Sequence, residues 1–495
     1  MDPPIEYPAY DGDLAFTSSA CSGSKIEQPR QTYSLSFSPS RSFSFQQQID
    51  TEDNDFPRRR PVRVSGDVVF RRDGAESSSL TLETIVNDES ISVGVEYDDE
   101  RQAMVVTTPA SLPWDDKVTA PCIALRVTVW APAGAQLDTL NVNNVHLGIK
   151  LLDNLSVRVA REVSLSTIVG QISAATSGDE DNQKLIHDGA PASFALDARS
   201  IDVRTTAAPI RGSWPLYDRL SLASTSGDIA AGIEPRPARP DAEEPAALFL
   251  RTTSGDIEAW EPVHAAQAAF AAQLGGAEAA AARKPEALVP PRNYLTTVHS
   301  TSGTVRGALA FTRAAQVEGV SGNVALDLLP VLPAALAGGG GDASSLVTST
   351  ISGATVVRLL KPLWVDDSAR FVAAPPAGLA AARGAVGAEA APGSVEEEAR
   401  RGIASFLRVL SSRHISTSAA IHVEYPGAWE GGIELASHTG DLEVAGRDVR
   451  VIRRDGRWPG VNKRVVARKG NVEDNQGSQL HAQTTSGNIE VLFPS

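Results

Sequence analysis

The stretch Thr252–Ile257, which reads Thr-Thr-Ser-Gly-Asp-Ile, decides the fold class because close copies of it recur along the chain. A nearly identical hexapeptide, Thr-Thr-Ser-Gly-Asn-Ile, occupies Thr484–Ile489. Further related copies begin at residues 224, 300, 319, 350 and 437. Self-similar segments are typical of repeat architectures, in which each unit buries its apolar face against its neighbours.

Comparison of the copies indicates what each position requires. A small residue stands two before the Ser, and an aliphatic residue such as Leu222 or Leu250 stands two before that. Because side chains alternate along a strand, the aliphatic residue, the small residue and the Ser are predicted to share one face. Gly then permits a positive φ, Asp or Asn suits a tight turn, and an aliphatic residue such as Ile229 restarts the strand. We interpret the unit as the corner of a β-solenoid coil with stacked hydroxyls and a stacked aliphatic core.

The rest of the chain also favours β structure. Period-2 alternation over Ile91–Tyr97 and Ile123–Val129 is typical of half-buried strands. From Leu137, short apolar runs follow one another with no helical pattern between them. The predicted class is therefore all-β: a β-solenoid or β-roll of stacked short strands with low-complexity insertions and one helical insertion, preceded by a β-rich N-terminal region.

The composition along the chain predicts three regions. Residues 1–30 are expected to be a disordered leader, residues 31–136 an N-terminal β region, and residues 137–495 the repetitive β-solenoid. Insertions are expected at about residues 235–247, 262–294, 330–345 and 374–412. The Ala-rich stretch 264–291 has helical character, and Val395–Leu410 predicts an amphipathic helix. Such insertions are tolerated at one rim of a solenoid.

The charge and the cysteine content exclude several classes of function. A net charge of −15 argues against a broad nucleic-acid-binding face, and the one compact basic run, Arg58–Arg60, balances the acidic stretch Asp50–Asp55. Cys21 and Cys122 are too few for a disulfide framework and too far apart for a zinc site, so we expect neither. No apolar run reaches the ~18 residues of a membrane span, and no signal peptide pattern is seen.

Acidic turn residues are the strongest candidates for chemistry. Asp228, Asp256 and Asp441 would line one edge of a solenoid, as calcium ligands do. In other copies of the hexapeptide the same position holds a residue that is not acidic, namely Asn323, Asn488, Thr304 or Ala354, which a required carboxylate would not allow. A structural turn role is therefore predicted for the acidic residues as well.

Two other patterns are weaker. His414 and His422 share strand parity, but their Ser/Ala-rich surroundings do not favour a metal site. Ser22 and Lys25 match the Ser-x-x-Lys pattern only within the leader, where no pocket could tune the Lys. We predict no catalytic residue, no cofactor-binding residue or cofactor, and no metal ligand.

The repeated Ser-Gly-Asp/Asn-aliphatic unit resembles the putative adhesin family, a domain of unknown function found in bacteria and fungi. Residues 252–258 and 484–491 match it best, and the resemblance extends over roughly residues 137–495, more weakly over 31–136. The Ala/Pro-rich insertions are similar to those of fungal members. The resemblance implies a β-solenoid or β-roll with a surface role and no established catalytic residues.

We therefore expect a non-enzymatic, adhesin-like binding or structural protein that presents an elongated β-solenoid surface to an unknown protein or glycan ligand. Two alternatives remain: a carbohydrate-active β-solenoid enzyme, either a lyase or a hydrolase, and an intracellular scaffold. No nucleic acid partner and no membrane span are expected. The expected location is the cell surface if the resemblance holds and the N-terminus is incomplete, and the cytoplasm otherwise.

Overall fold

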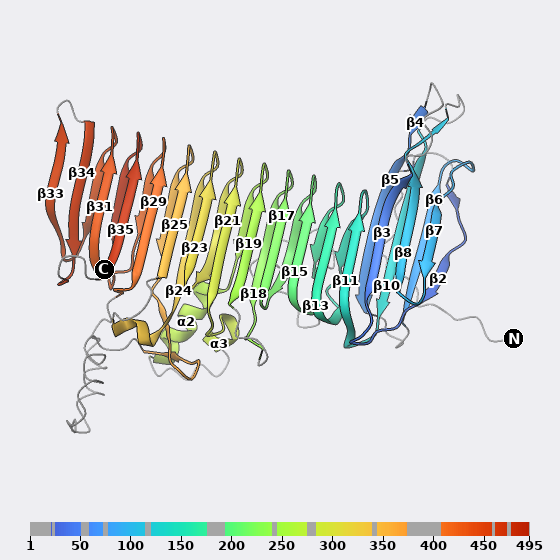
Figure 1. Cartoon of the computed structure of the whole chain (residues 1–495), viewed down its shortest axis with the longest axis horizontal. Coiled ribbons are helices and arrows are strands. Elements are labelled where there is room, and N and C mark those ends of the chain that lie inside the picture. Colours follow the sequence, from blue (N-terminus) through green and yellow to red (C-terminus); the bar gives the residue numbers. More distant parts are fainter. Residues whose placement is uncertain are drawn as a thin grey trace. The chain divides into compact units, whose positions relative to one another are not determined.

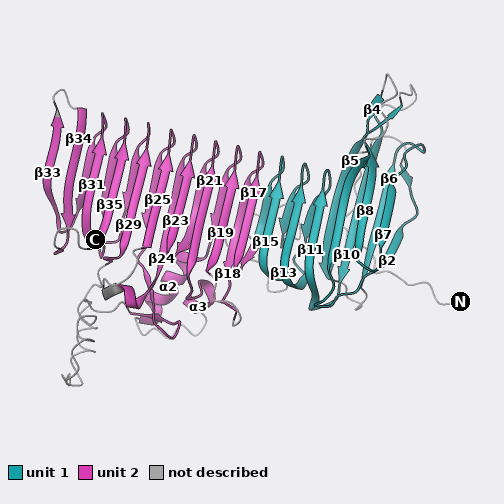
Figure 2. Cartoon of the chain, viewed as in Figure 1, with its two compact units in different colours: residues 1–213 teal, residues 214–495 magenta. Residues whose placement is uncertain are grey.

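The computed structural model describes residues 21, 25–50, 59–72, 78–113, 120–175, 194–239, 245–274, 284–338, 344–373, 407–457, 461–472 and 477–494. The chain divides into two compact units, Met1–Ser213 and Trp214–Ser495 (Figure 2). Both units consist mostly of strands arranged in large sheets, which confirms the all-β class (Figure 1).

The first unit contains the following strands, the last of which crosses the unit boundary: β1 (Ile26–Glu27), β2 (Gln31–Ser34), β3 (Phe43–Asp50), β4 (Arg59–Pro61), β5 (Arg63–Arg72), β6 (Ser79–Val86), β7 (Gly94–Asp98), β8 (Ala103–Pro109), β9 (Ser111–Pro113), β10 (Cys122–Ala131), β11 (Ala135–Asn144), β12 (Gly148–Leu151), β13 (Ser156–Thr167), β14 (Ile172–Ala174), β15 (Ala195–Thr205) and β16 (Ile210–Leu216). One sheet has the order β7-β8-β3-β11-β13-β15, parallel except for the β7–β8 pair. In the other sheet, β5 pairs in parallel with β10 and β12, and β6 pairs antiparallel with β1, β2 and β10.

Strand β10 crosses the core of the first unit and is buried on both faces, so the prediction of a half-buried strand over Ile123–Val129 was wrong. Ile123, Leu125 and Val127 are fully buried, and the residues between them, Ala124 and Arg126, are at most 9% exposed because β10 is paired on both sides, with β5 and β6. Phe43 and Phe70 meet edge to face with ring centroids 6.1 Å apart, and both line a small apolar cavity. Burying a side chain of this kind contributes about 1.5–3 kcal/mol.

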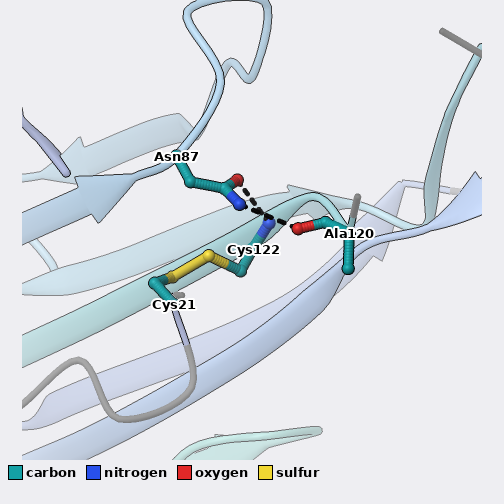
Figure 3. The surroundings of a disulfide bond; sticks show 4 residues. All are labelled: Cys21, Asn87, Ala120 and Cys122. Carbon is teal, nitrogen blue, oxygen red and sulfur yellow. Dashed lines mark hydrogen bonds between the residues drawn. A yellow bond between two sulfur atoms is a disulfide. The ribbon is translucent and has the colours of Figure 1, made fainter. Parts of the chain in front are cut away.

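A disulfide bond joins Cys21 to Cys122 (Figure 3), a single bridge that the sequence did not lead us to expect, although two cysteines make no disulfide framework. The two residues are separated by 101 positions, and only the fold brings their Cα atoms to 5.4 Å. The Asn87 side chain holds the segment before Cys122, because its Nδ2 donates to Ala120 O and its Oδ1 accepts from Cys122 N, both at 2.8 Å. Cys21 and Cys122 are buried, with exposed fractions of 3% and 1%.

The N-terminal regions also differ from the prediction. Most of residues 1–30 lie outside the described residues, but Cys21 is bonded as above and Ile26–Glu27 pairs with Val86 and Ile85 of β6. The part of the predicted leader that contains these residues is therefore structured. Strand β11 crosses the boundary predicted at residue 137, since its parallel pairing with β13 begins at Ala135.

The second unit contains two long parallel sheets whose strands alternate along the chain (Figure 1). The first has the order β17 (Arg219–Ser224), β19 (Ala246–Thr252), β21 (Tyr294–Ser300), β23 (Ala314–Gly319), β25 (Ser344–Thr350), β29 (Leu410–Ser416), β35 (Ser478–Thr484), β31 (Gly431–Ser437), β34 (Val461–Lys469) and β33 (Val449–Arg457), the last two antiparallel. The second has the order β18 (Ile229–Pro235), β20 (Ile257–Trp260), β22 (Val305–Phe311), β24 (Val324–Pro333), β26 (Thr355–Leu359), β30 (Ile421–Glu424), β36 (Ile489–Phe493) and β32 (Leu442–Gly446). Two short strands, β27 (Leu363–Val365) and β28 (Phe371–Val372), pair with each other, and β27 also pairs with β24.

The register of these strands aligns equivalent positions of the repeated hexapeptide. Leu222, Leu250 and Val298 lie side by side on β17, β19 and β21. Ile229 and Ile257 form a second row on β18 and β20, which continues with Val305. All six side chains are at most 1% exposed. Stacking of like positions on a parallel, in-register sheet buries the aliphatic residues that a single strand would leave in water.

The turn glycines serve a different purpose from the one predicted. None of Gly255, Gly303 and Gly322 has a left-handed φ. A Cβ at Gly303 would lie 1.8 Å from Gly255 O, and one at Gly322 would lie 1.8 Å from Gly303 O. The expectation of a positive φ was therefore wrong: Gly is required because the backbones of adjacent turns approach too closely for a side chain.

The last strands of the chain do not take the last places in the sheets. β35 lies between β29 and β31, and β36 lies between β30 and β32. The C-terminal segment is thus hydrogen-bonded on both sides. Consecutive elements are usually neighbours in space, so this order could not be read from the sequence.

The helices lie within the insertions, as does the short 3-10 helix η2 (Ala334–Gly338). α2 (Val263–Leu274) and α3 (Pro285–Leu288) occupy the Ala-rich stretch that has helical character. The helix predicted over Val395–Leu410 falls mostly outside the described residues, and its end was wrong. Leu407 forms an isolated bridge with Trp429 and Leu410 begins β29, because both Leu side chains are buried among the strands.

Two insertion boundaries also differ from those predicted. β24 continues to Pro333, past the expected start of an insertion at residue 330. β29 begins at Leu410, before the expected end at residue 412. In both places buried apolar residues extend the strand.

Candidate functional site

The turns of the second unit are closed by the buried small residue of the hexapeptide. Ser224 Oγ accepts a hydrogen bond from Gly227 N at 2.8 Å, and Thr252 Oγ1 accepts one from Gly255 N at 2.9 Å. The same contact recurs at Ser300, Ser437 and Thr484. The Ser that precedes the Gly is exposed, as at Ser226 and Ser254, so the prediction that it shares the inward face was wrong. The chain leaves the strand before that Ser, and the alternation ends there.

The acidic turn residues connect one turn to the next. Asp228 Oδ1 accepts from Asp256 N at 3.0 Å, and Asp256 Oδ1 accepts from Thr304 N at 2.7 Å. Asn residues make the same bond in other turns: Asn323 Oδ1 accepts from Ala354 N at 3.0 Å, and Asn488 Oδ1 from Asp441 N at 2.9 Å. Because a carboxylate and an amide serve equally as the acceptor, the contact requires an oxygen and not a charge.

The three acidic candidates do not form one site. Asp228 and Asp256 lie on adjacent turns, whereas Asp441 lies next to Asn488. Lys463 Nζ donates to Asp441 at 2.6 Å and lowers the pKa of that carboxyl. Among the described residues, no group of three or more His, Cys, Asp or Glu side chains is arranged to hold a metal ion. Ser22 lies outside the described residues.

His414 and His422 point to different surroundings in spite of their shared parity. His414 is fully buried on β29, with its two ring nitrogens 2.8 Å from Thr348 Oγ1 and 2.9 Å from Tyr425 Oη. Burial lowers the pKa of His414 to about 3, so the ring is neutral at physiological pH. His422 lies on the outward face of β30. A turn separates the two strands, and side chains alternate regularly only within one strand. The even spacing of His414 and His422 in the sequence therefore does not mean that they lie on the same face.

A row of ionisable side chains crosses the outward face of the second sheet. We call it the charged row and define it as His264 of α2, Asp327 of β24, Arg358 of β26, His422 and Glu424 of β30, and Glu490 of β36. The register places Asp327 opposite Arg358, Arg358 opposite Glu424, and His422 opposite Glu490. Each of these strands buries its alternate residues, so the charged ones face outward.

Contacts connect every member of the charged row to the next. His264 Nε2 lies 2.8 Å from Asp327, and Arg358 Nε lies 3.6 Å from Asp327 and 3.4 Å from Glu424. His422 bridges two carboxylates, with Nε2 3.4 Å from Glu424 and Nδ1 2.8 Å from Glu490. The side chains are partly exposed, from 23% at Asp327 to 57% at Arg358.

The charged row offers hydrogen-bond donors and acceptors in a fixed order along neighbouring strands. Adjacent strands are about 4.7–4.9 Å apart, so an extended ligand with many hydroxyl or charged groups could contact several members at once. Sequence reasoning missed the row because its strand residues are up to 163 positions apart, from Asp327 to Glu490. As long as the pairing of the strands is unknown, the sequence does not show which outward side chains will be neighbours.

A buried carboxyl, that of Glu261, lies between the end of β20 and the start of α2. Glu261 is 4% exposed, and its Oε2 accepts from Ala310 N at 2.6 Å, while its Oε1 has no hydrogen-bond partner. Burial raises the pKa of Glu261 to about 8, and the Ala310 bond opposes that shift. The carboxyl is therefore largely protonated at neutral pH.

Comparisons with known proteins give no family. No protein-family model and no curated protein matches the chain. The structure of a putative adhesin from Bacteroides fragilis is similar to this chain, with 9% sequence identity and a TM-score of 0.28; the alignment covers 68% of this chain and 98% of the adhesin. A putative cell adhesion protein from Clostridium sporogenes is similar to 94% of this chain over 99% of its own, with 5% identity and a TM-score of 0.15. A putative lipid binding protein from Parabacteroides distasonis is similar to 67% over 97%, with 9% identity and a TM-score of 0.25. Similarities this weak do not place the chain in a family.

Within the described part of the chain, no helix combines the length and the apolarity that a membrane span requires.

Proposed function

We propose that this chain is a non-enzymatic, adhesin-like binding protein built as a β-solenoid, whose outward strand faces form the contact surface. The observation that carries the proposal is the charged row, in which neighbouring strands present mutually paired, partly exposed side chains. Such a surface suits a repetitive ligand, for example a glycan chain, because each of its units can meet an equivalent position of the protein.

The solenoid part of the proposal rests on strand order. In the second unit the chain passes repeatedly from one sheet to the other, as from β17 to β18 and from β19 to β20. Strands two apart in the sequence pair in parallel and in register. One strand from each sheet would then make one coil, closed at one corner by the Ser/Thr-capped turn.

The rigidity of this surface supports binding. The turns are closed internally by hydroxyl caps and are joined to one another by the bonds from Asp228, Asp256, Asn323 and Asn488. Side chains held on such a scaffold lose little conformational freedom when a ligand arrives, and this lowers the entropic cost of association.

The disulfide between Cys21 and Cys122 supports a location outside the reducing cytoplasm. Disulfides persist in oxidising compartments and are rare where glutathione and thioredoxin keep thiols reduced. A surface role therefore accounts for the disulfide better than an intracellular scaffold does.

A binding experiment with the full chain tests the proposal. Immobilised protein is exposed to a panel of neutral and acidic polysaccharides, and both retention and release of reducing ends are measured. We expect retention of at least one polysaccharide without release of reducing ends. Replacing His422 by Ala and Glu490 by Gln should weaken retention, whereas replacing Arg251, which is exposed on β19 of the other sheet, should not. Failure to retain any polysaccharide would refute the proposal.

The rival enzyme hypothesis draws on one observation, the two carboxylates that His422 brings together. Glycosidases use a pair of carboxyl groups about 5–10 Å apart on either side of the scissile bond. If reducing ends are released, the variants Glu424→Gln and Glu490→Gln decide the matter. Loss of that release in both variants would replace the binding proposal with a carbohydrate-active enzyme.

A further inference from the structure

One segment of this acidic chain is strongly basic. Between Arg447 and Lys469 there are nine Lys or Arg residues and only two acidic residues, a net charge of +7 that leaves −22 for the rest of the chain. The segment forms the antiparallel hairpin of β33 and β34, and β33 is the terminal strand of its sheet. In the sequence these basic residues are interspersed with apolar ones and form no compact basic run, so they gave no signal of a basic surface.

The pairing of the two strands places four arginines on one face. Arg450 lies opposite Arg468, Arg453 lies opposite Val466, and Asp455 lies opposite Arg464. Residues directly opposite on antiparallel strands share a face. The alternate residues of β34, such as Val465, are buried and mark the inward face. We call Arg450, Arg453, Arg464 and Arg468 the arginine face.

A β-bulge produces this arrangement. Arg450 and Arg453 are three positions apart, so in a regular strand they would point to opposite sides. The register shifts between Val451 and Arg453, which leaves Ile452 as the extra residue. Bulges re-aim side chains, and they recur next to functional sites. Arg454, the next residue along the strand, lies opposite Val465 and so points to the other side.

Acidic residues pair with part of this face. Arg453 pairs with Asp455 at 2.7 Å, and Arg464 pairs with Glu434 at 2.7 Å. Arg450 lies directly opposite Arg468, so an anion bound to this face could meet two guanidinium groups at once. Arg450 is exposed, and guanidinium groups bind carboxylate and sulfate oxygens in a bidentate manner.

The edge itself does not favour the addition of a peptide strand. β33 contains two register shifts, one at Ile452 and one between Asp455 and Arg457. A bulged edge interrupts the ladder that an added strand would need, and basic side chains on an edge are a known protection against pairing. The net charge of −22 on the rest of the chain opposes the approach of a large, rigid polyanion such as duplex DNA.

We propose that the arginine face binds an acidic polysaccharide, that is, a flexible chain carrying carboxylate or sulfate groups. The inference rests on the proposed binding function and names a ligand class for it. A flexible chain can follow the arginines along the hairpin and stay within the ~8–10 Å over which their charge is felt at physiological salt. Ile452, the extra residue of the bulge between Arg450 and Arg453, is 58% exposed and allows apolar contact with the faces of sugar rings.

The test compares two single substitutions on one strand. Binding of the full chain to dextran sulfate, polygalacturonate and neutral dextran is measured with Arg450→Ser, which alters the arginine face, and with Arg454→Ser, which removes the same charge from the opposite side. We expect both acidic polymers to bind and neutral dextran not to bind. Arg450→Ser should weaken binding about tenfold, since charge-assisted hydrogen bonds contribute on that order, and Arg454→Ser less than about twofold.

A second pair of variants distinguishes loss of the arginine face from a general loss of positive charge, because both double variants remove two arginines. Arg450→Ser/Arg468→Ser should weaken binding more than Arg450→Ser does, whereas Arg251→Ser/Arg413→Ser, two exposed positions elsewhere in the same sheet, should leave it unchanged. Equal losses in the two double variants would overturn the site, and so would equal losses in Arg450→Ser and Arg454→Ser. Tighter binding of duplex DNA, an acidic peptide or anionic lipid vesicles than of the polysaccharides would overturn the ligand class.

The outcome also separates this inference from the proposed function. If the wild type and every arginine variant retain a polysaccharide equally, the chain is a binding protein but the arginine face is not its site. If no polysaccharide is retained by the wild type, both proposals fail together.

Discussion

Substitution of Gly322 by Ala would place a methyl group against the backbone of the adjacent turn. An ideal Cβ at Gly322 lies 1.8 Å from Gly303 O and 2.4 Å from Gly303 C. The obstacle is main chain and cannot rotate away, as the end of a flexible side chain could. One turn must therefore move relative to the other.

The size of the effect follows from the contacts around this turn. An ordinary contact begins near 3.4 Å, so relief requires a shift of roughly 1.6 Å, about a third of the spacing between strands. Such a shift breaks the hydrogen bonds from Ser321 N to Thr301 O at 2.9 Å and from Val305 N to Asn323 O at 2.8 Å. With about 1 kcal/mol for each bond and about 1–3 kcal/mol for overpacking, Gly322→Ala should lower the free energy of unfolding of the second unit by roughly 3–5 kcal/mol.

Gly319→Ala is the matched control, because Gly319 belongs to the same hexapeptide. A Cβ at Gly319 meets nothing closer than Thr350 Cγ2 at 3.4 Å, so the change should stay within about 0.5 kcal/mol. Gly319→Ser goes further. Residue 319 takes the same position in its hexapeptide as Ser300 does in the preceding copy, where Ser300 Oγ accepts a hydrogen bond from Gly303 N at 3.0 Å. A serine at 319 should accept a hydrogen bond from Gly322 N in the same way and stabilise the unit by about 1 kcal/mol.

Thermal unfolding and hydrogen exchange measure these differences. A unit of this size loses roughly 2–4 °C in Tm for each kcal/mol, so Gly322→Ala should lower the Tm by about 6–20 °C. Amides of β21 to β24 should lose protection first, because the damaged contact lies between those strands. If Gly322→Ala and Gly319→Ala prove equally stable, backbone crowding is not the reason for glycine in these turns.

Three further predictions concern the turn acids, the disulfide and the buried carboxyl. Asp256→Ala should lower the free energy of unfolding by about 1 kcal/mol, because Thr304 N loses its acceptor, while Asp256→Asn should leave it unchanged in urea titrations; a loss of equal size in both variants would mean that the charge matters. Replacing Cys21 and Cys122 together by Ser should destabilise the first unit by about 2–4 kcal/mol, and dithiothreitol should then have no further effect on its unfolding curve. The pKa of Glu261 is raised to about 8 in the folded chain, so the neutral carboxyl is the stabilised form. The stability is complete below the unfolded pKa and is lost as the pH rises from about 4.5 to 8, by at most about 1.4 kcal/mol per pH unit. Glu261→Gln should abolish that dependence, and an unchanged pH profile in this variant would contradict the assignment.

The features that the sequence did not reveal share a physical origin in contacts between distant segments. The disulfide joins residues 101 positions apart, and the bulge at Ile452 appears only once β33 pairs with β34. His414 and His422 were compared by parity, but an intervening turn changes the strand and therefore the face. In the turns, the reason for glycine is the backbone of the next turn, which a single copy of the hexapeptide does not contain.

By itself, the sequence determined the all-β class and the interchangeability of Asp and Asn in the turns, because both follow from alternation and from comparison of neighbouring copies within the chain. The tertiary structure alone decided which outward side chains meet. Arg358 reaches Glu424, and Arg450 comes to face Arg468, through the register of paired strands. Register is set by packing against neighbours and by the insertion of β35 and β36 between earlier strands. A surface that is assembled across several strands therefore exists only in the folded sheet, and the sequence of its residues does not show that they will be neighbours.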